Sequence, residues 1–520
     1  MQLSDAAVPM AVALAAYAAT VGMTGHADRA GGVVTLSIVG TTDLHGAAFD
    51  RHGNGGLALL GGYVANLRAA RAADGGAVLL IDAGDTYQGG IESNLSEGAL
   101  VVDAYNALGY TAAAIGNHEF DFGPVDVAGR RVSPLADPRG ALEAIAARAR
   151  FPVLAANLVD EATERPVDWP NVTPSALVDA AGVRVGLIGV MTIDALQKTL
   201  AVNTRGLRVT PLAPAIAAEA SALRAAGARV VVVAAHAGGR CRQFDNPSDL
   251  SSCDDASEIF QVARALRPGL VDAIVAGHAH AGVAHVVNGI AITESFSHGR
   301  AFGRIDLAFD RGRGAVTAAR VFAPRSLCAT ENPRTRGCDP SVDAGPFVPA
   351  RYEGRPVAPD AAVAGAMAPA LEAVRHLRET PLGAVADTPL GRAAGGGSPL
   401  GNLFADALRA SVPGADVALV NGSARGGLRA DLPAGPLTFG LLYDAFPFDN
   451  QVVRLQMTGA ELGRVLGTAL ELGRPGTLGI SGIRVRVTCA EGAPQLDLRR
   501  ATGAPVAAVE PLIVVTTEML

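Results

Sequence analysis

The stretch Ile115-Gly116-Asn117-His118-Glu119-Phe120-Asp121-Phe122-Gly123 decides the fold of this chain, because several polar groups follow directly on the apolar run 112–115. A short apolar run is typical of a buried strand. In open α/β sheets, ligands collect just beyond the carboxyl ends of the strands. We therefore expect a strand that ends in a site, with Asn117 and His118 facing a cleft.

The same pattern occurs at four more places before residue 281, so five candidate strands each end in Asp, Asn or His. The other apolar runs are 33–39, 77–81, 230–235 and 273–276. Together the strand ends offer oxygen and imidazole groups and no thiolate: Asp43, His45, Asp85, Asn117, His236, His278 and His280. Oxygen and imidazole donors suit borderline divalent ions such as Zn or Mn, whereas a site that selects soft ions would contain thiolates.

Seven side chains are too many for one tetrahedral ion. If one carboxylate bridges, the seven side chains make eight bonds, four to each of two ions, and leave room for water and substrate. We therefore expect two divalent metal ions, Zn, Mn or similar. A single histidine of this kind is more often a buried structural residue, but five strand ends in order favour a joint site.

The motifs D-x-H, G-D, G-N-H-E-F-D, an isolated strand-end His and G-H-x-H resemble the calcineurin-like metallophosphoesterases. The G-N-H-E-F-D form is similar to the 5'-nucleotidase and 2',3'-cyclic-nucleotide phosphodiesterase branch. The resemblance runs from about Val33 to the last residue. It implies an α/β fold: a four-layer metallophosphoesterase β-sandwich flanked by helices, plus a smaller α+β 5'-nucleotidase C-terminal domain.

The alternation of strands and helices in the chain itself also implies a largely buried sheet. Apolar residues recur at helical spacing in four segments, where we expect helices. These segments are Gly56–Ala73, Val101–Leu108, Pro211–Ala226 and Ala361–Arg378.

The resemblance implies a role for each strand-end residue. One ion would be held by Asp43, His45, Asp85 and His280, and the other by Asp85, Asn117, His236 and His278, with Asp85 bridging. A metal-bridging water would attack the phosphorus. His118 would stabilise the phosphoryl oxygens or protonate the leaving group, and Asp121 would orient that imidazole and raise its pKa. The alternative for Asp121 is a cap on the turn at 122–123. We expect no ligand role for His52, His285, His298 or His376.

A chain of 520 residues is too long for one ordinary domain, so we expect two. The expected divisions are a signal peptide at 1–30, a catalytic domain at 31–350, a linker helix at 351–380 and a substrate-binding domain at 381–520. The apolar stretch 9–23 before Gly25-His26-Ala27 favours a secretory signal over a membrane span. Its n-region has Asp5 and no Lys or Arg, so a disordered or misassigned start is the alternative.

Three motifs in the second half resemble nucleotidase C-terminal domains. Ser398–Arg409 is similar to their G-N-L-x-A-D-A helix, Asn421–Leu432 to their N-x-G-G-I-R-x-x-L turn with a longer Asn-to-Arg interval, and Phe446–Asn450 to their P-F-x-N element. The resemblance implies that Arg429 and Asn421 contact the substrate and that the ring of Phe448 stacks on the base. Arg392 is a further candidate for the phosphate, with an ordinary exposed arginine as the alternative.

The last strand, 515–520, has Met519 where the family has a second stacking Phe, and the family's G-G-D-G is absent. We therefore expect either a sequence that stops short or an incomplete base pocket.

The composition describes a soluble globular protein, with 49% hydrophobic and 18% charged residues. Because 43 basic and 50 acidic residues give a formal charge of -7, we expect no nucleic-acid partner, and we expect no stable membrane span. The cysteine pairs Cys241 with Cys253 and Cys328 with Cys338 are expected to form disulfides, which indicates a secreted, periplasmic or cell-envelope protein. Zinc is the alternative for these pairs, but no C-x-x-C spacing favours it.

The main hypothesis is a dimetal phosphohydrolase that releases phosphate from nucleoside 5'-monophosphates, with other nucleotides as further substrates. One alternative keeps the site but changes the substrate to a 2',3'-cyclic nucleotide, a UDP-sugar or a thiosulfate ester. Another is a non-catalytic surface-binding protein. The sequence leaves open the metal identity, the preferred base and the oligomeric state.

Overall fold

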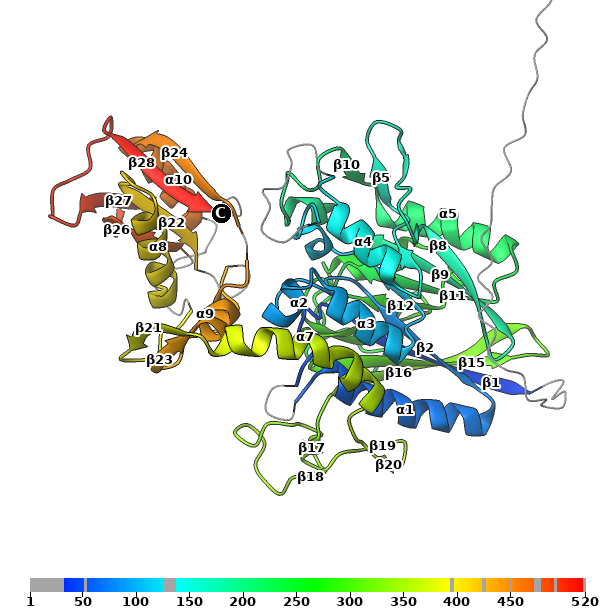
Figure 1. The fold of residues 1–520 in the computed structure, drawn as a ribbon. Coiled ribbons are helices and arrows are strands. Elements are labelled where there is room, and N and C mark those ends of the chain that lie inside the picture. Colours follow the sequence, from blue (N-terminus) through cyan, green and yellow to red (C-terminus); the bar gives the residue numbers. More distant parts are fainter. Residues whose placement is uncertain are drawn as a thin grey trace, which may run out of the picture.

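The computed structural model describes residues 32–50, 54–125, 137–392, 397–422, 427–448, 450–471, 478–490 and 493–517. The expected signal peptide, His52 and the last three residues of the chain lie outside these ranges. The described residues form a first domain built on two large sheets and a second, smaller domain, with helix α7 between them (Figure 1).

The first sheet has seven strands in the order β16-β15-β1-β2-β3-β4-β7. The neighbours from β1 to β7 run parallel, and β15 and β16 are antiparallel additions at one edge. The strands are β1 (Val33–Thr41), β2 (Ala77–Asp82), β3 (Ala112–Ala114), β4 (Val153–Leu154), β7 (Val172–Thr173), β15 (Ala301–Asp310) and β16 (Ala315–Ser326).

The second sheet has six strands in the order β13-β14-β12-β11-β9-β8. Its four central strands are parallel, and its two edge strands pair antiparallel. The strands are β8 (Ser175–Ala180), β9 (Val183–Met191), β11 (Val230–His236), β12 (Ala273–Ala276), β13 (Gly282–Val287) and β14 (Ile290–Ser295).

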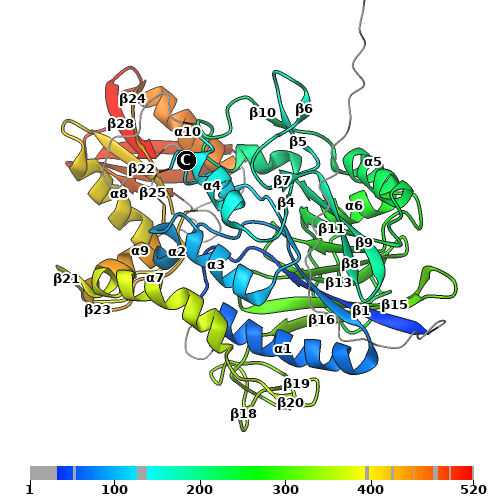
Figure 2. The same cartoon turned by 45° about the vertical axis from the view of Figure 1, so that its right-hand side comes forward.

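The two sheets pack face to face around one apolar core, which includes Leu36 and Ile81 from the first sheet and Leu187 and Val232 from the second. Helices α1 (Leu57–Asp74) and α3 (Ala99–Leu108) bury apolar residues against the other face of the first sheet. Helices α5 (Leu212–Ala225) and α6 (Glu258–Ala265) do the same for the second sheet (Figure 2). Helix, sheet, sheet and helix make four layers, so the expected fold class is confirmed.

Glycines allow the two sheets to approach closely at two points. A Cβ on Gly40 of β1 would lie 2.7 Å from Val275 Cγ1 of β12. A Cβ on Gly189 of β9 would lie 2.3 Å from both Cβ and O of Leu154 in β4. Any side chain at these positions would push the sheets apart.

The second domain follows α7 (Ala361–Glu379), which packs along α1 and α3 of the first domain and then against α9. Its main sheet has four strands in the order β24-β28-β22-β25. Its elements are β21 (Pro381–Ala386), α8 (Pro399–Ser411), β22 (Val417–Asn421), β23 (Gly435–Thr438), α9 (Phe439–Ala445), β24 (Val452–Thr458), α10 (Gly459–Glu471), β25 (Leu478–Ser481), β26 (Ile483–Ala490), β27 (Ala493–Arg500) and β28 (Pro511–Thr517). Within the described part of the chain, no helix has the length and apolar content that a membrane span needs.

The four expected helices begin and end within two residues of α1, α3, α5 and α7. Both expected disulfides, Cys241–Cys253 and Cys328–Cys338, are present, so thiolate zinc ligation by these pairs is excluded. The long strand β16 was not expected from the sequence. It carries one fully buried apolar residue, Val321, and several exposed ones, so its hydrophobic pattern is weak.

Asp82 ends β2 inside the first domain and is fully buried. Its carboxylate accepts hydrogen bonds from the hydroxyls of Thr41, Thr86 and Tyr105, at 2.7 to 2.9 Å, and from the backbone N–H of Gly84. Burial raises the pKa of Asp82 to about 6 despite these donors. The carboxylate thereby ties β1, β2 and α3 to the loop that continues to Asp85.

We predict that Gly189→Ala destabilises the first domain by about 1–3 kcal/mol, the usual cost of adding a methyl group to a packed interior. Thermal unfolding followed by circular dichroism measures the effect. The control is Gly365→Ala in the exposed part of α7, where a new Cβ meets nothing within 4 Å. The control should be neutral or slightly more stable, and equal melting of the Gly189 variant and the wild type would contradict the close packing.

We predict that the stability advantage of the wild type over Asp82→Asn falls as pH rises from about 4 to about 6. The pKa of Asp82 is about 6 in the folded protein and about 4 in an unfolded chain. The folded state therefore binds more protons in this window, and raising the pH removes up to about 3 kcal/mol of stability. Melting temperatures of both proteins at several pH values test this. A difference that is constant or grows with pH would contradict it.

Candidate metal centre at the strand ends

The loops that follow β1, β2, β3, β11 and β12 bring all seven predicted ligands to one place. The first three strands are parallel neighbours in one sheet, and the other two are parallel neighbours in the facing sheet. Their carboxyl ends therefore open at the same edge of the sandwich. Backbone bonds from Asp43 N to Gly84 O and from His45 N to Asp85 O, both 2.9 Å, hold the first two loops together.

The predicted ligands fall into two groups that share Asp85. Ligand atoms of Asp43, His45, Asp85 and His280 all lie within 4.8 Å of one another, and so do those of Asp85, His236 and His278. In the first group, the Nε2 atoms of His45 and His280 are 3.0 Å apart. In the second, His236 Nε2 lies 3.2 Å from Asp85 Oδ2 and 3.0 Å from His278 Nδ1. The amide oxygen of Asn117 lies 3.1 Å from His236 Nε2 and completes this group.

The backbone is strained at this site. Asp43, His45, Asp85, His278 and His280 all have positive φ angles, between 50° and 74°. Non-glycine residues adopt this left-handed region at a cost, and such residues cluster at functional sites where the surrounding structure enforces them. Five strained residues in two facing donor groups indicate that the fold holds these side chains in place for a ligand.

Buried hydrogen bonds fix the orientation of two imidazoles. His236 donates from Nδ1 to the carbonyl oxygen of Ala83 at 2.8 Å, and His45 donates from Nδ1 to that of Gln88 at 3.2 Å. Each ring then presents Nε2 to its group, which is the arrangement expected of metal-binding histidines.

The donor set fits divalent metal ions. Burial, followed by Arg429 and His280, holds the pKa of His45 well below its usual value, and burial and His236 lower the pKa of His278 to about 3. Both shifts favour the neutral imidazole, the form that binds metal ions. Burial also disfavours charge on His236, but Asp85 outweighs it and raises the pKa to about 10. A position between carboxylate, amide and imidazole that favours positive charge is suited to a cation.

Two buried glutamates accept hydrogen bonds from backbone N–H groups of the ligand loops. Their roles are not among those expected from the sequence. Glu119 accepts hydrogen bonds from the backbone N–H groups of Gly116, Asp85 and Thr86 at 2.6 to 2.8 Å. Glu294 accepts from Gly239 and Ala281, which flank His236 and His280. Neither role follows from local pattern alone, since Glu119 also binds Asp85 and Thr86 in another loop and both partners of Glu294 lie outside its strand.

His118 and Asp121 form a close pair beside Asp85. The Nδ1 of His118 lies 2.6 Å from Asp121 Oδ2, and its backbone N–H donates to Asp85 Oδ1 at 2.8 Å. Burial lowers the pKa of His118, but the Asp121 and Asp85 carboxylates outweigh burial and raise it. Thr199 donates to the other oxygen of Asp121 at 2.7 Å.

The second domain reaches the same site. A cavity of about 1270 Å³ is lined from the first domain by Asp85, Asn117, His118, Asp121, His278 and His280, and from the second domain by Arg392, Asn421, Arg429 and Phe448. The guanidinium of Arg429 lies over the ring of Phe448, 5.3 Å from its centroid. Arg392 is engaged elsewhere, because it donates to Asp431 and to the carbonyl oxygen of Arg429.

Two further residues lie at the site: no role is expected for Lys198 from the sequence, and His298 is expected there only not to be a ligand. The ammonium nitrogen of Lys198 lies 2.9 Å from His278 Nε2. The ring of His298 lies 5.2 Å, between centroids, from that of His45. Lys198 could have been found, because it follows the parallel strand β9, whose carboxyl end opens at the same edge. The same signal applies to His298, which lies three residues past the end of the parallel strand β14.

Comparison with known families matches both halves of the chain. Residues 36–282 match the family described as calcineurin-like phosphoesterase, and residues 379–500 match the 5'-nucleotidase, C-terminal domain. The Bacillus subtilis protein named endonuclease YhcR is 27% identical over 84% of this chain and 33% of its own length. Protein UshA of Yersinia enterocolitica is 25% identical over 89% of this chain and 80% of its length. The chain thus spans only a third of the first of these relatives.

Solved structures share the two-domain fold. The 5'-nucleotidase precursor from Thermus thermophilus superposes with a TM-score of 0.67 over 93% of this chain and 89% of its own, at 24% identity. The sulfate thiohydrolase SoxB from the same organism gives a TM-score of 0.64 over 93% and 88%, at 17% identity. At these identities the likeness concerns the fold alone. Residues 36–282 therefore belong to the calcineurin-like phosphoesterase family, and residues 379–500 to the family of the 5'-nucleotidase C-terminal domain.

Proposed function

We propose that this protein hydrolyses nucleoside 5'-monophosphates to the nucleoside and phosphate, with two divalent ions as cofactors. The observation that carries the proposal is the position of Asp85, which belongs to both donor groups and borders a cavity that the second domain also lines. The two donor groups, whose ions would neutralise a phosphate, thus open into the same cavity as residues of the second domain that are suited to hold the rest of a nucleotide.

In this proposal Asp43, His45, Asp85 and His280 hold one ion, and Asp85, Asn117, His236 and His278 hold the other. Divalent ions in such a pair, when bound, neutralise the phosphoryl oxygens and make water a nucleophile at neutral pH. The protein contributes the fixed donor geometry, which the two glutamates and the strained loops support.

His118 acts on the substrate side of Asp85. Because Nδ1 is held by Asp121 at 2.6 Å, the ring offers Nε2 to the cavity. A proton at Nε2 can stabilise a phosphoryl oxygen or pass to the oxygen of the departing nucleoside. Asp121 keeps the imidazole in this orientation, and Thr199 in turn holds Asp121.

We propose a catalytic domain at 31–350, a linker helix at 351–380 and a second domain at 381–520. The second domain would bind the nucleotide. Arg429 would grip the phosphate, since a guanidinium offers paired donors to it. Phe448 would stack on the base, while Asn421 and Arg392 would line the same pocket. Gln88, in the loop after Asp85, donates to Pro447 O, and Asn94, the last residue of helix α2 (Ile91–Asn94), donates to Tyr443 OH. These bonds across the interface support a direct link between base pocket and metal centre.

A secreted or cell-envelope location is part of the proposal. The two disulfides support it, because such bonds persist in oxidising compartments. A Listeria monocytogenes relative, 25% identical over 89% of this chain, is named a cell wall protein.

Other substrates are the alternatives on the same scaffold. The named activities of the relatives and structural neighbours, an endonuclease and a sulfate thiohydrolase, show that this scaffold accompanies different chemistry in other proteins. A panel of AMP, ATP, UDP-glucose, a 2',3'-cyclic nucleotide, a thiosulfate ester and single-stranded DNA distinguishes these alternatives. A protein that binds ions but turns over none of them would be a surface-binding module instead.

We predict that the manganese-loaded protein releases phosphate from AMP and that His118→Asn lowers kcat by about 10²- to 10⁴-fold, the usual contribution of a positioned acid or base. Release of inorganic phosphate measures both. His376→Ala, which removes an exposed imidazole from α7, is the matched control and should keep full activity. A His118 variant as active as the wild type would refute the proposed role.

A further inference from the structure

His298 lies on the segment that joins β14 to β15, beside the first donor group. Its backbone N–H donates to the carbonyl oxygen of Asp43 at 2.7 Å. Its ring centroid is 5.2 Å from that of His45 and 5.7 Å from that of His280. No role for this imidazole follows from the reaction proposed above.

His298 stands outside the donor group itself. The ligand atoms that gather within 4.8 Å belong to Asp43, His45, Asp85 and His280. The Nδ1 atom of His298 lies instead 2.8 Å from the hydroxyl of Ser297. The ring is therefore a neighbour of the metal centre, held by its own hydrogen bond.

The backbone of His298 shows the same strain as the ligands. Its φ is +59°, in the left-handed region where the five strained ligand residues also lie. The next residue, Gly299, also has φ +59°, and a Cβ there would lie 2.9 Å from both Ala47 O and Leu44 Cδ1. The segment is thus pressed against the loop that carries His45.

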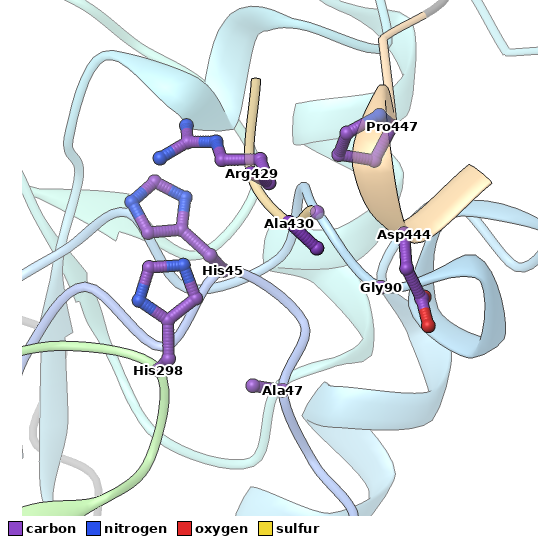
Figure 3. Close-up of a pocket in the computed structure, with 9 residues that line it drawn as sticks. His45, Ala47, Gly90, His298, Arg429, Ala430, Asp444 and Pro447 are labelled. Atoms are coloured by element: carbon purple, nitrogen blue, oxygen red, sulfur yellow. The ribbon is translucent and has the colours of Figure 1, made fainter. Parts of the chain in front are cut away.

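The ring of His298 is directed toward the ring of His45, and the guanidinium of Arg429 lies beyond that ring (Figure 3). These three residues line a small side cavity of about 60 Å³ next to the main one. The Nε of Arg429 is buried and has no hydrogen-bond partner among the described residues. His298 and Arg429 also line the main cavity, together with Asp85, His118 and His280. An imidazole N–H and a guanidinium on the same wall suit an anionic oxygen as their acceptor.

We propose that His298 is a further substrate-contact residue, which donates a hydrogen bond from Nε2 to a phosphoryl oxygen together with Arg429. The hydroxyl of Ser297 lies 2.8 Å from Nδ1 and engages that nitrogen, so Nε2 is the nitrogen left for a ligand, and the proposal places the proton there. This inference rests on the proposed phosphohydrolase function and names one of the groups that hold the phosphate.

The test is the binding of inorganic phosphate to the manganese-loaded protein, measured by isothermal titration calorimetry. His298→Gly removes the ring and tolerates the positive φ, whereas alanine would add strain. His298→Gln carries an amide nitrogen near the position of Nε2, and His298→Asn, which also tolerates this φ, carries one near Nδ1. His376→Ala is the control. Metal content and melting temperature of every variant show whether the site and the fold remain.

We expect His298→Gly to keep two ions per chain and to bind phosphate about tenfold more weakly, the usual effect of losing one hydrogen bond to a charged group. The KM for AMP or p-nitrophenyl phosphate should rise by a similar factor. His298→Gln should restore most of the affinity and His298→Asn little. Asn tolerates the positive φ of this position better than Gln does, so a merely structural role would favour the Asn variant, the opposite of the expected order.

Unchanged phosphate affinity in His298→Gly would overturn the inference. Loss of an ion in that variant would also overturn it, because His298 would then be a ligand, and so would equal rescue by Asn and Gln. The proposed function is tested by a different measurement, the hydrolysis of nucleotides by the wild type. If the wild type binds phosphate through His298 but hydrolyses no nucleotide, the function fails and this contact stands.

Discussion

The carboxylate of Asp85 is the group on which the rest of this structure depends. It lies between the two histidine groups, 3.9 Å from His45 Nε2 and 3.2 Å from His236 Nε2, and it accepts the backbone N–H of His118. It is almost fully buried, so its negative charge is unfavourable unless cations or donors surround it. The two facing sheets serve this group, because they bring donors from five parallel strands to one edge.

Bringing these donors together strains the backbone of the ligand loops and buries charged side chains. Hydrogen bonds close to the site stabilise both. Glu119 binds the N–H groups on both sides of the Asp85 loop, and Asp82 ties the same loop to Thr41 and Tyr105. The loop then continues through Gln88 and Asn94 to the second domain. One short segment therefore connects the buried core, the metal centre and the substrate domain, which explains how a domain far along the chain can bring Arg429 to the site.

Much of the fold and the metal centre could be predicted because their signals are local. Each ligand comes within a few residues of the end of an apolar run, and the strand pattern predicts where that run ends. Glu294 had no such signal, since it lies inside β14 and meets Gly239 and Ala281 only through packing. The position of Arg392 against Asp431, and the cavity between the domains, depend on how separate segments pack. No local pattern encodes such packing, so the substrate pocket could be inferred only by resemblance.

The most direct measurement of the central claim is anomalous diffraction from crystals of the protein soaked in manganese. The account predicts two peaks about 3.5 to 4 Å apart, with Asp85 bound to both and His45 and His236 on opposite sides. A single peak, or peaks that Asp85 does not touch, would contradict a centre in which one carboxylate holds two ions.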